Sequence, residues 1–134
     1  MSVPPPKARV LIVDDEAAFR MMLTLLLQKN GFECVAAPDG EAAVELLNRD
    51  TFDVGVFDIM MPGMNGGELA SIAREVSPDM RLIAVSALAC SPELTDFGFE
   101  AALQKPFKVE SLVRICRSFA ERKPDSPASS AELN

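Results

Sequence analysis

The chain has 134 residues, of which 49% are apolar and 25% are charged, and its net charge at neutral pH is −7. This length suits one domain with a buried core, and the acidic balance argues against a surface that binds nucleic acid or an anionic membrane. The chain contains no histidine, tryptophan or tyrosine, which excludes Ser-His or Cys-His catalysis and histidine-ligated zinc.

Five apolar strand segments alternate with five helical segments along the chain. The first strand is expected over 9–13, where Arg9 is followed by a continuous apolar run. Such a run is typical of a strand buried on both faces of a sheet. The other strands are expected over 32–37, 53–58, 81–86 and 99–104. Helices are expected over 17–30, 41–48, from the Asn65-Gly66-Gly67 lead to Val76, over about two turns between Ser91 and Gly98, and over 109–122.

Apolar side chains recur at helical spacing in four of these helices and are expected to face a core. They are Phe19, Met22, Leu23, Leu26 and Leu27; Ala43, Leu46 and Leu47; Leu69, Ile72, Ala73 and Val76; and Leu112, Val113, Ile115, Cys116 and Phe119. The alternation predicts an α/β fold, a doubly wound parallel sheet with helices on both faces. In such folds the functional site lies at the carboxyl ends of the strands.

Polar residues with compatible chemistry gather at those predicted strand ends. Asp14 and Asp15 follow the first strand, Asp58 ends the third, Ser86 ends the fourth and Lys105 follows the fifth. Two carboxylates about 5 Å apart repel by roughly 3 kcal/mol at an effective dielectric constant near 20, so three pairs would cost on the order of 10 kcal/mol. A divalent cation offsets this repulsion better than one lysine does. Oxygen ligands favour Mg²⁺, which also binds phosphate oxygens.

This chemistry suits a phosphoryl group. Asp58, expected to be the most exposed carboxylate, is the candidate nucleophile because aspartate can form an aspartyl-phosphate. Lys105, the Ser86 hydroxyl and Mg²⁺ could contact the peripheral phosphoryl oxygens. Each residue alone also has an ordinary structural explanation. Asp14 and Asp15 could cap a helix, Asp58 could start a turn, Ser86 could be a small strand-end residue, and Lys105 with its proline could form a surface turn.

The chain resembles a bacterial two-component response-regulator receiver domain over about residues 8–121. Four segments carry the resemblance: VLIVDDE at 10–16, DIMMPGMNG at 58–66, SA at 86–87 and KPF at 105–107. The resemblance implies a flavodoxin-like sheet of order 2-1-3-4-5 and a cis bond before Pro106. It also implies a cytoplasmic signalling module, not an enzyme, which assists its own phosphorylation and dephosphorylation.

The resemblance also assigns roles to individual residues. Asp58 would accept the phosphoryl group from a histidine kinase or a histidine phosphotransfer protein. Asp15, Asp58 and the main-chain carbonyl of Met60 would ligate Mg²⁺ directly, and Asp14 would hold it through water. Lys105 would pair with the phosphoryl group and Asp58. Ser86 would be the switch hydroxyl that alters the binding of a downstream protein through the face formed by strands four and five.

Three features depart from the family pattern. Ala102 stands where the family has an aromatic residue coupled to the switch hydroxyl, and Phe99 is interpreted as core packing rather than a replacement. The segment from Ser86 to Lys105 is about three residues shorter than in the family, which shortens the fourth helix. Met60 and Leu88, two residues beyond Asp58 and Ser86, are apolar and flank the path of the hydrolytic water in the family. They predict slow self-dephosphorylation.

Other functional classes remain alternatives at this point. A pseudo-receiver would bind proteins without taking phosphate. A Mg²⁺-dependent aspartyl phosphatase would need an acid where Met60 stands, and nucleotide binders would need a GxxxxGK[ST] or GxGxxG loop, which the chain lacks. The expected organisation is a flexible arm at 1–8, a receiver domain at 9–122 and a disordered tail or linker at 123–134. That tail is too short for a DNA-binding or catalytic domain, so the chain is either a stand-alone regulator or part of a longer protein.

Cysteine usage and the N-terminus predict the compartment. Cys34, Cys90 and Cys116 are an odd number without a CxxC pair, which is typical of small, partly buried residues in a reducing compartment. The N-terminal MSVPPPKARV lacks the apolar core of a signal peptide, and no apolar run approaches the roughly 18 residues that span a bilayer. A soluble, cytoplasmic protein without a membrane partner is therefore expected.

Overall fold

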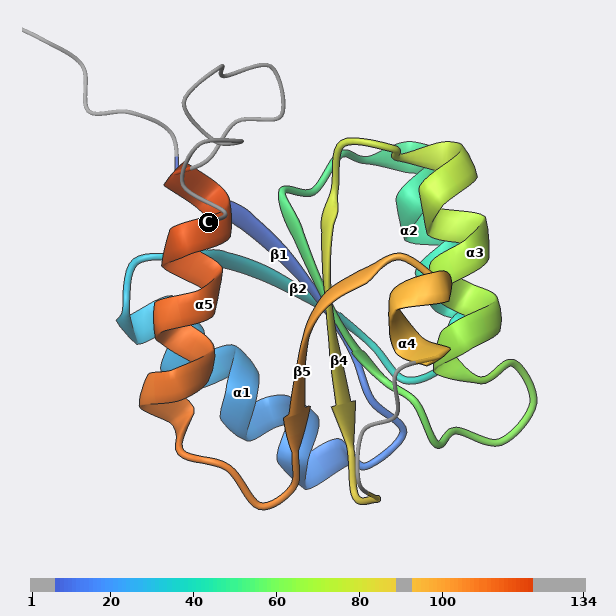
Figure 1. Cartoon of the computed structure of the whole chain (residues 1–134). Coiled ribbons are helices and arrows are strands. Elements are labelled where there is room, and N and C mark those ends of the chain that lie inside the picture. Colours follow the sequence, from blue (N-terminus) through green and yellow to red (C-terminus); the bar gives the residue numbers. More distant parts are fainter. Residues whose placement is uncertain (1–6, 89–92, 122–134) are drawn as a thin grey trace, which may run out of the picture.

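The computed structural model describes residues 7–88 and 93–121. The five strands form a sheet at the centre, with helices on both sides (Figure 1). In chain order the elements are β1 (Arg9–Val13), α1 (Ala17–Lys29), β2 (Glu33–Ala37), α2 (Gly40–Arg49), β3 (Val54–Asp58), α3 (Gly66–Val76), β4 (Arg81–Ser86), α4 (Glu93–Asp96), β5 (Phe99–Gln104) and α5 (Val109–Glu121).

The five strands form one parallel sheet of order β2-β1-β3-β4-β5. This result confirms the predicted fold class and strand order. The order changes direction at β1, so the crossover helices cover opposite faces of the sheet. Because all strands are parallel, their carboxyl ends share one edge.

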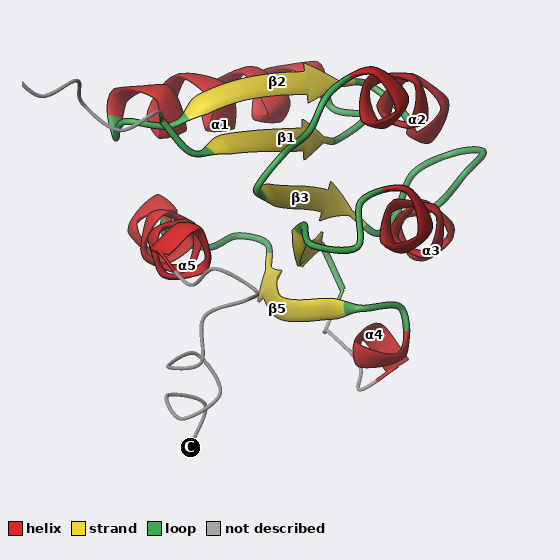
Figure 2. Cartoon of the chain, turned by 90° about the horizontal axis from the view of Figure 1, so that it is seen from above, coloured by secondary structure: helices red, strands yellow, loops and turns green. Residues whose placement is uncertain are grey.

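A separate apolar cluster covers each face of the sheet. Figures 1 and 2 show α1 and α5 on one face and α2, α3 and α4 on the other. The α1/α5 cluster has as its buried members Val10, Ile12, Leu23, Leu27, Phe32, Val54, Val56, Ile83, Val85, Leu112, Val113, Cys116 and Phe119. Alternate strand residues, including Leu11, Val13, Phe57, Leu82 and Ala84, pack on the α2/α3 side. This alternation makes each strand apolar on both faces, as its sequence predicted.

The amino end of α3 is fixed against the end of β3. Asn65 caps the helix by accepting a hydrogen bond from the Glu68 amide at 2.9 Å, and Glu68 Oε1 accepts one from the Asn65 amide at 3.1 Å. The Gly66 amide donates to the Ile59 carbonyl at 3.1 Å. A Cβ on Gly66 would lie 2.4 Å from the Asp58 carbonyl oxygen. The α3 backbone therefore contacts the backbone of the Asp58 loop directly.

The pairing of β5 with β4 contains a bulge. Phe99 is paired with Leu82, whereas Ala101 is paired with Ile83, so Glu100 has no partner in the β4 register. The Glu100 carboxylate instead forms an ion pair with Arg81 at 2.9 Å. Phe99 packs in the cluster on the α2/α3 side, and Ala101 packs against the α1/α5 cluster. The bulge thus lets residues two apart in the same strand face opposite sides of the sheet.

Several local predictions need correction. β2 begins at Glu33 and β3 at Val54, one residue later than predicted. Met22 and Val76, expected to face the core, are exposed because each lies at the border of its helix's apolar face. The described part of α4 is Glu93–Asp96, shorter than the two turns expected.

Some expectations fall outside the described residues. They concern the start of the fourth helix at Ser91, Cys90, residues 1–6 of the arm predicted at 1–8, and the tail predicted at 123–134. None of the helices within residues 7–88 and 93–121 combines the length and apolar character that crossing a bilayer requires.

Candidate functional site

The structure brings the predicted acidic residues together at the carboxyl edge of the sheet. Asp14 and Asp15 directly follow β1, and Asp58 is the last residue of β3. Each offers a carboxylate oxygen within 4.8 Å of those of the other two. Asp14 and Asp58 are only 2% and 5% exposed, and Asp15 is exposed. This set of three carboxylates, two of them buried, matches the oxygen ligands that Mg²⁺ prefers.

Lys105 provides a positive charge at the same edge. Its ammonium donates a hydrogen bond to Asp14 Oδ2 at 3.0 Å and lies 3.9 Å from Asp58 Oδ2. The Lys105 main-chain amide donates to the Ser86 carbonyl at 2.7 Å, which continues the ladder of β4 and β5 beyond the last strand residue. The following bond to Pro106 is cis, as the sequence resemblance implied. The β5–α5 loop therefore holds the lysine beside two of the three carboxylates.

Asp14 is not the N-cap of α1, although its side chain contacts the start of that helix. Its Oδ1 atom accepts a hydrogen bond from the Glu16 amide at 2.9 Å, leaving Oδ2 for Lys105. Arg20, one turn into α1, donates to the Asp14 carbonyl oxygen at 2.7 Å. The N-cap residue of α1 is Glu16, whose side chain makes no capping hydrogen bond. The Asp14 side chain thus connects the start of α1 to the lysine.

The environment of Asp58 differs from the prediction in one respect. We expected the most exposed carboxylate of the three, but Asp58 is buried and Asp15 is the exposed one. Nothing in the residue pattern indicated that the loop after β3 folds back over the strand end, where the Met60 amide donates to Asp58 Oδ1 at 3.2 Å. Burial, and next the neighbouring Asp14 charge, raise the pKa of Asp58 from 3.8 to about 6, and Lys105 partly opposes this. Asp58 is therefore mainly ionised at pH 7, but a larger fraction of it is protonated than of an exposed aspartate.

Ser86 is also buried at the end of β4, next to the residue paired with Asp58. Asp58 is paired with Val85, so Ser86 lies one position further toward the carboxyl edge. Its hydroxyl oxygen accepts a hydrogen bond from the Leu88 amide at 3.1 Å. The hydroxyl therefore holds the first turn of the loop that follows β4.

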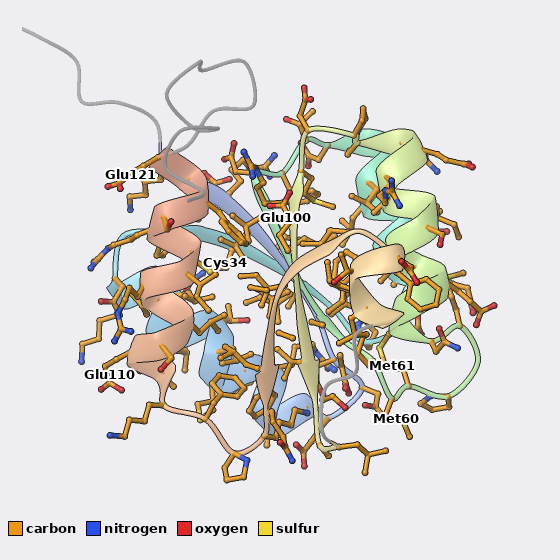
Figure 3. All side chains as sticks on the ribbon, viewed as in Figure 1. Cys34, Met60, Met61, Glu100, Glu110 and Glu121 are labelled. Carbon is orange, nitrogen blue, oxygen red and sulfur yellow. The ribbon has the colours of Figure 1, made fainter. Side chains whose placement is uncertain are left out.

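Two apolar side chains border the site in the loops after β3 and β4. Met60 is 56% exposed and Leu88 is 60% exposed. In Figure 3 the labelled Met60 lies at the carboxyl end of the sheet, below Met61. Met61 is buried in the α2/α3 cluster, so the two adjacent methionines have different environments. Met60 therefore presents an apolar surface to solvent beside Asp58.

The residues of β5 that depart from the family pattern occupy distinct environments. Ala102 is exposed and paired with Ala84. Phe99 is buried, and its ring packs edge-on against Phe57 with centroids 6.3 Å apart. This position confirms that Phe99 is a core residue and does not stand in for an aromatic at 102.

Sequence reasoning missed two side chains of α1 that reach the site. Arg20 binds the Asp14 carbonyl, and the Phe19 ring lies under the Lys105 ammonium, 4.2 Å from the ring centroid. Phe19 was expected only as a core residue. Its position one turn after the Asp14-Asp15 pair was the one available signal, because that turn must lie at the same edge of the sheet.

Comparison with known proteins agrees with this geometry. The family model for the response regulator receiver domain matches residues 10–117. The response regulator MprA of Mycobacterium leprae is 35% identical over 130 residues, which cover 94% of this chain and 57% of that protein. The chain thus spans about half the length of the curated relatives it matches.

Solved structures of similar proteins have the same fold. The receiver domain of the Francisella response regulator 1452 is 29% identical with a TM-score of 0.81, covering 87% of this chain and 98% of that one. The response regulator TrrA of Thermotoga maritima, solved in complex with Mg²⁺ and BeF, is 29% identical with a TM-score of 0.77, covering 84% and 98%. The described residues therefore correspond to nearly the whole of each of these chains.

Proposed function

Because the chain belongs to the response regulator receiver family, we propose that it accepts a phosphoryl group on Asp58 from a histidine kinase or a histidine phosphotransfer protein. One observation carries the proposal. Three carboxylates with oxygens within 4.8 Å of one another lie at one edge of the sheet beside a lysine. These four residues come from the ends of three strands, β1, β3 and β5. Helix caps and surface turns alone would not require this convergence.

The proposed reaction is a direct transfer of the phosphoryl group from the histidine of the donor protein to the carboxylate of Asp58. A carboxylate oxygen of Asp58 attacks the phosphorus of the donor and forms an acyl phosphate bond. The P–N bond of a phosphohistidine breaks, and its electron pair stays on the imidazole nitrogen. The Lys105 ammonium, 3.9 Å from Asp58, neutralises charge on the transferred group, and the Ser86 hydroxyl can donate to one of its oxygens.

Mg²⁺ is the cofactor that these residues could hold. Asp15, Asp58 and the Met60 carbonyl are the proposed direct ligands, and Asp14 is the proposed ligand through water. When bound, the ion would offset the repulsion between the carboxylates and the incoming phosphoryl oxygens. The similar response regulator TrrA was solved with Mg²⁺ and BeF bound, which supports magnesium for a receiver of this type.

The proposed consequence of phosphorylation is altered binding of a downstream protein. Ser86 links the site to the loop after β4 through Leu88, and β5 lies next to β4. Ala102 removes the aromatic group that the family uses there, so we propose that the signal is carried by the loop and backbone. The net charge of −7 supports protein partners in place of nucleic acid or membrane for this chain. We also propose a cytoplasmic location and a receiver unit at 9–122.

Acetyl phosphate, with measurement of intact mass, tests the proposed function. With Mg²⁺, the wild-type protein should gain one phosphoryl group, and Asp58→Ala should gain none. Asp79→Ala, an exposed aspartate in the loop before β4, is the matched control and should behave as wild type. No mass gain by the wild type would favour the pseudo-receiver alternative. A gain that survives Asp58→Ala would move the acceptor to another residue.

The phosphoryl group on Asp58 is expected to be long-lived. Met60 and Leu88 are exposed apolar side chains beside the site and provide no group that orients an attacking water. Met60→Glu should shorten the phosphoryl half-life by about tenfold or more, because a carboxylate can orient or deprotonate that water. Decay of the phosphorylated mass after removal of acetyl phosphate measures this half-life.

The control for this lifetime is Met21→Glu, which changes an exposed methionine on α1. It should leave the half-life within a factor of about two, since the charge lies outside the site. A wild-type half-life of seconds would contradict the expectation of slow loss.

A further inference from the structure

The Lys105 ammonium contacts an aromatic ring as well as the carboxylates. Its nitrogen lies 3.0 Å from Asp14 Oδ2, 3.9 Å from Asp58 Oδ2 and 4.2 Å from the centroid of the Phe19 ring. The first two neighbours attract the lysine from the sheet edge. The third comes from α1 and faces the charge with its π surface. Lys105 is therefore contacted from three elements besides its own loop, the ends of β1 and β3 and helix α1.

The Phe19 ring is itself fixed in place. It packs edge-on against Phe107, with ring centroids 5.9 Å apart and planes at 90°. Both rings lie against the α1/α5 cluster. Phe107 follows Lys105 by two residues, so this aromatic pair ties α1 to the loop that carries the lysine. A ring held on one side by Phe107 can act as a rigid support for the ammonium.

A phenyl ring supports the ammonium without using its hydrogen-bond donors. The negative face of the ring attracts the cation, yet it accepts no strong hydrogen bond. All three ammonium donors stay available, one for Asp14 and the others for Asp58 or for oxygens bound to it. A carboxylate or amide at position 19 would compete for those donors, and an aliphatic side chain would pack without attracting the charge.

We propose that Phe19 is a positioning residue, whose ring holds the Lys105 ammonium where it can contact a phosphoryl group on Asp58. This inference rests on the proposed phosphorylation of Asp58. A lysine side chain has a flexible stem of four carbons and loses much conformational freedom when its ammonium group is held in one position. The ring restricts that freedom before the phosphoryl group arrives, so less ordering remains for the transfer itself.

Fluorinated phenylalanines at position 19 test this role. Adding one and then three fluorines to the ring weakens its negative face while largely keeping its shape. The rate of Asp58 phosphorylation by acetyl phosphate with Mg²⁺ should fall stepwise, by about three- to tenfold for the trifluoro ring. The matched control is the same series at Phe32, a buried member of the α1/α5 cluster at the other end of α1, which should leave the rate unchanged within twofold.

Two natural substitutions and a spectroscopic measurement complete the test. Phe19→Leu should slow phosphorylation by a similar factor, and Phe19→Tyr should restore most of the rate because it keeps the π face. In the wild type, the Lys105 side-chain methylene protons should be shifted upfield by the Phe19 ring current, and Phe19→Leu should abolish that shift.

The outcomes separate this inference from the proposed function. A phosphorylated wild type with equal rates across the position-19 fluorine series would overturn the role of Phe19 and leave the acceptor role of Asp58 standing. An absent ring-current shift would overturn the contact itself. A wild type that takes no phosphoryl group would overturn both.

Discussion

With Mg²⁺ withheld, the Asp58→Asn variant is expected to be more stable than the wild-type protein by about 3 kcal/mol at pH 8. The reason is that the wild-type fold buries a carboxylate beside Asp14, which raises the pKa of Asp58 from 3.8 to about 6. Asparagine has nearly the same shape and can still accept the hydrogen bond from the Met60 amide, but it carries no charge.

The size of this stability difference depends on pH. Between about pH 4 and 6 the folded protein holds a proton on Asp58 that the unfolded chain has released, so wild-type stability falls as pH rises through this window. Above pH 6 the full cost is present. Near pH 4 and below, the carboxyl group is protonated in the folded state and increasingly so in the unfolded state. The stability difference between variant and wild type should therefore shrink toward zero near pH 4.

Urea unfolding in EDTA from pH 4.5 to pH 8 measures this difference. Asp79→Asn, the change to an exposed aspartate at the opposite end of the sheet, should show no comparable gain. Mg²⁺ should remove most of the difference between Asp58→Asn and the wild type, because an ion at one hundred times its dissociation constant stabilises its binding state by about 2.7 kcal/mol. A variant less stable than wild type in EDTA at pH 8, or a difference independent of pH, would contradict the expected cost of burying the Asp58 charge.

The Gly66→Ala variant is expected to lose about 2–3 kcal/mol of folding stability and to be phosphorylated more than tenfold more slowly. The added Cβ would lie 2.4 Å from the Asp58 carbonyl oxygen and 2.8 Å from the Ile59 Cα. Both are backbone atoms, which cannot rotate away as a side chain can. The start of α3 and the end of β3 would have to separate, and the Asp58 carboxylate would move with its backbone.

The adjacent helical glycine gives a matched control for this loss. A Cβ on Gly67 would approach the Phe97 ring at 3.2 Å and the Asn65 side-chain oxygen at 3.3 Å. These groups can shift, and alanine favours the helix, so Gly67→Ala should change stability by less than about 1 kcal/mol. Urea unfolding and the acetyl phosphate reaction measure both variants. Equal behaviour of the two would show that the close approach of Gly66 to Asp58 has no special importance.

The sequence predicted the sheet and its site because both depend on short-range patterns. Continuous apolar runs mark strands buried on both faces, and the bounds of β4 and β5 were predicted without error. The parallel arrangement then places every strand-end residue at one edge. That is why Asp14, Asp58 and Lys105 could be predicted as neighbours although 91 residues separate the first from the last.

Features decided by contacts between distant segments were not predictable in the same way. Helix α1 has more apolar residues than the sheet can cover, so spacing alone could not show that Met22 remains exposed. The burial of Asp58 depends on how the loop after β3 folds back. The contact of Phe19 with Lys105 joins residues 86 positions apart through side-chain directions that the sequence pattern does not encode.

Because of the bulge at Glu100, β5 contains one residue more than its pairing with β4 requires. Its unpaired residue lies at the amino end of the strand, whereas Lys105 follows the carboxyl end. A β5 without Glu100 would alternate regularly from Phe99 to Ala101 and would still deliver Lys105 to the same edge and the same face. An inserted residue has no such accommodation, because it would turn the lysine to the opposite face or require a second bulge. The segment between α4 and Lys105 should therefore tolerate the deletion of one residue but not the insertion of one.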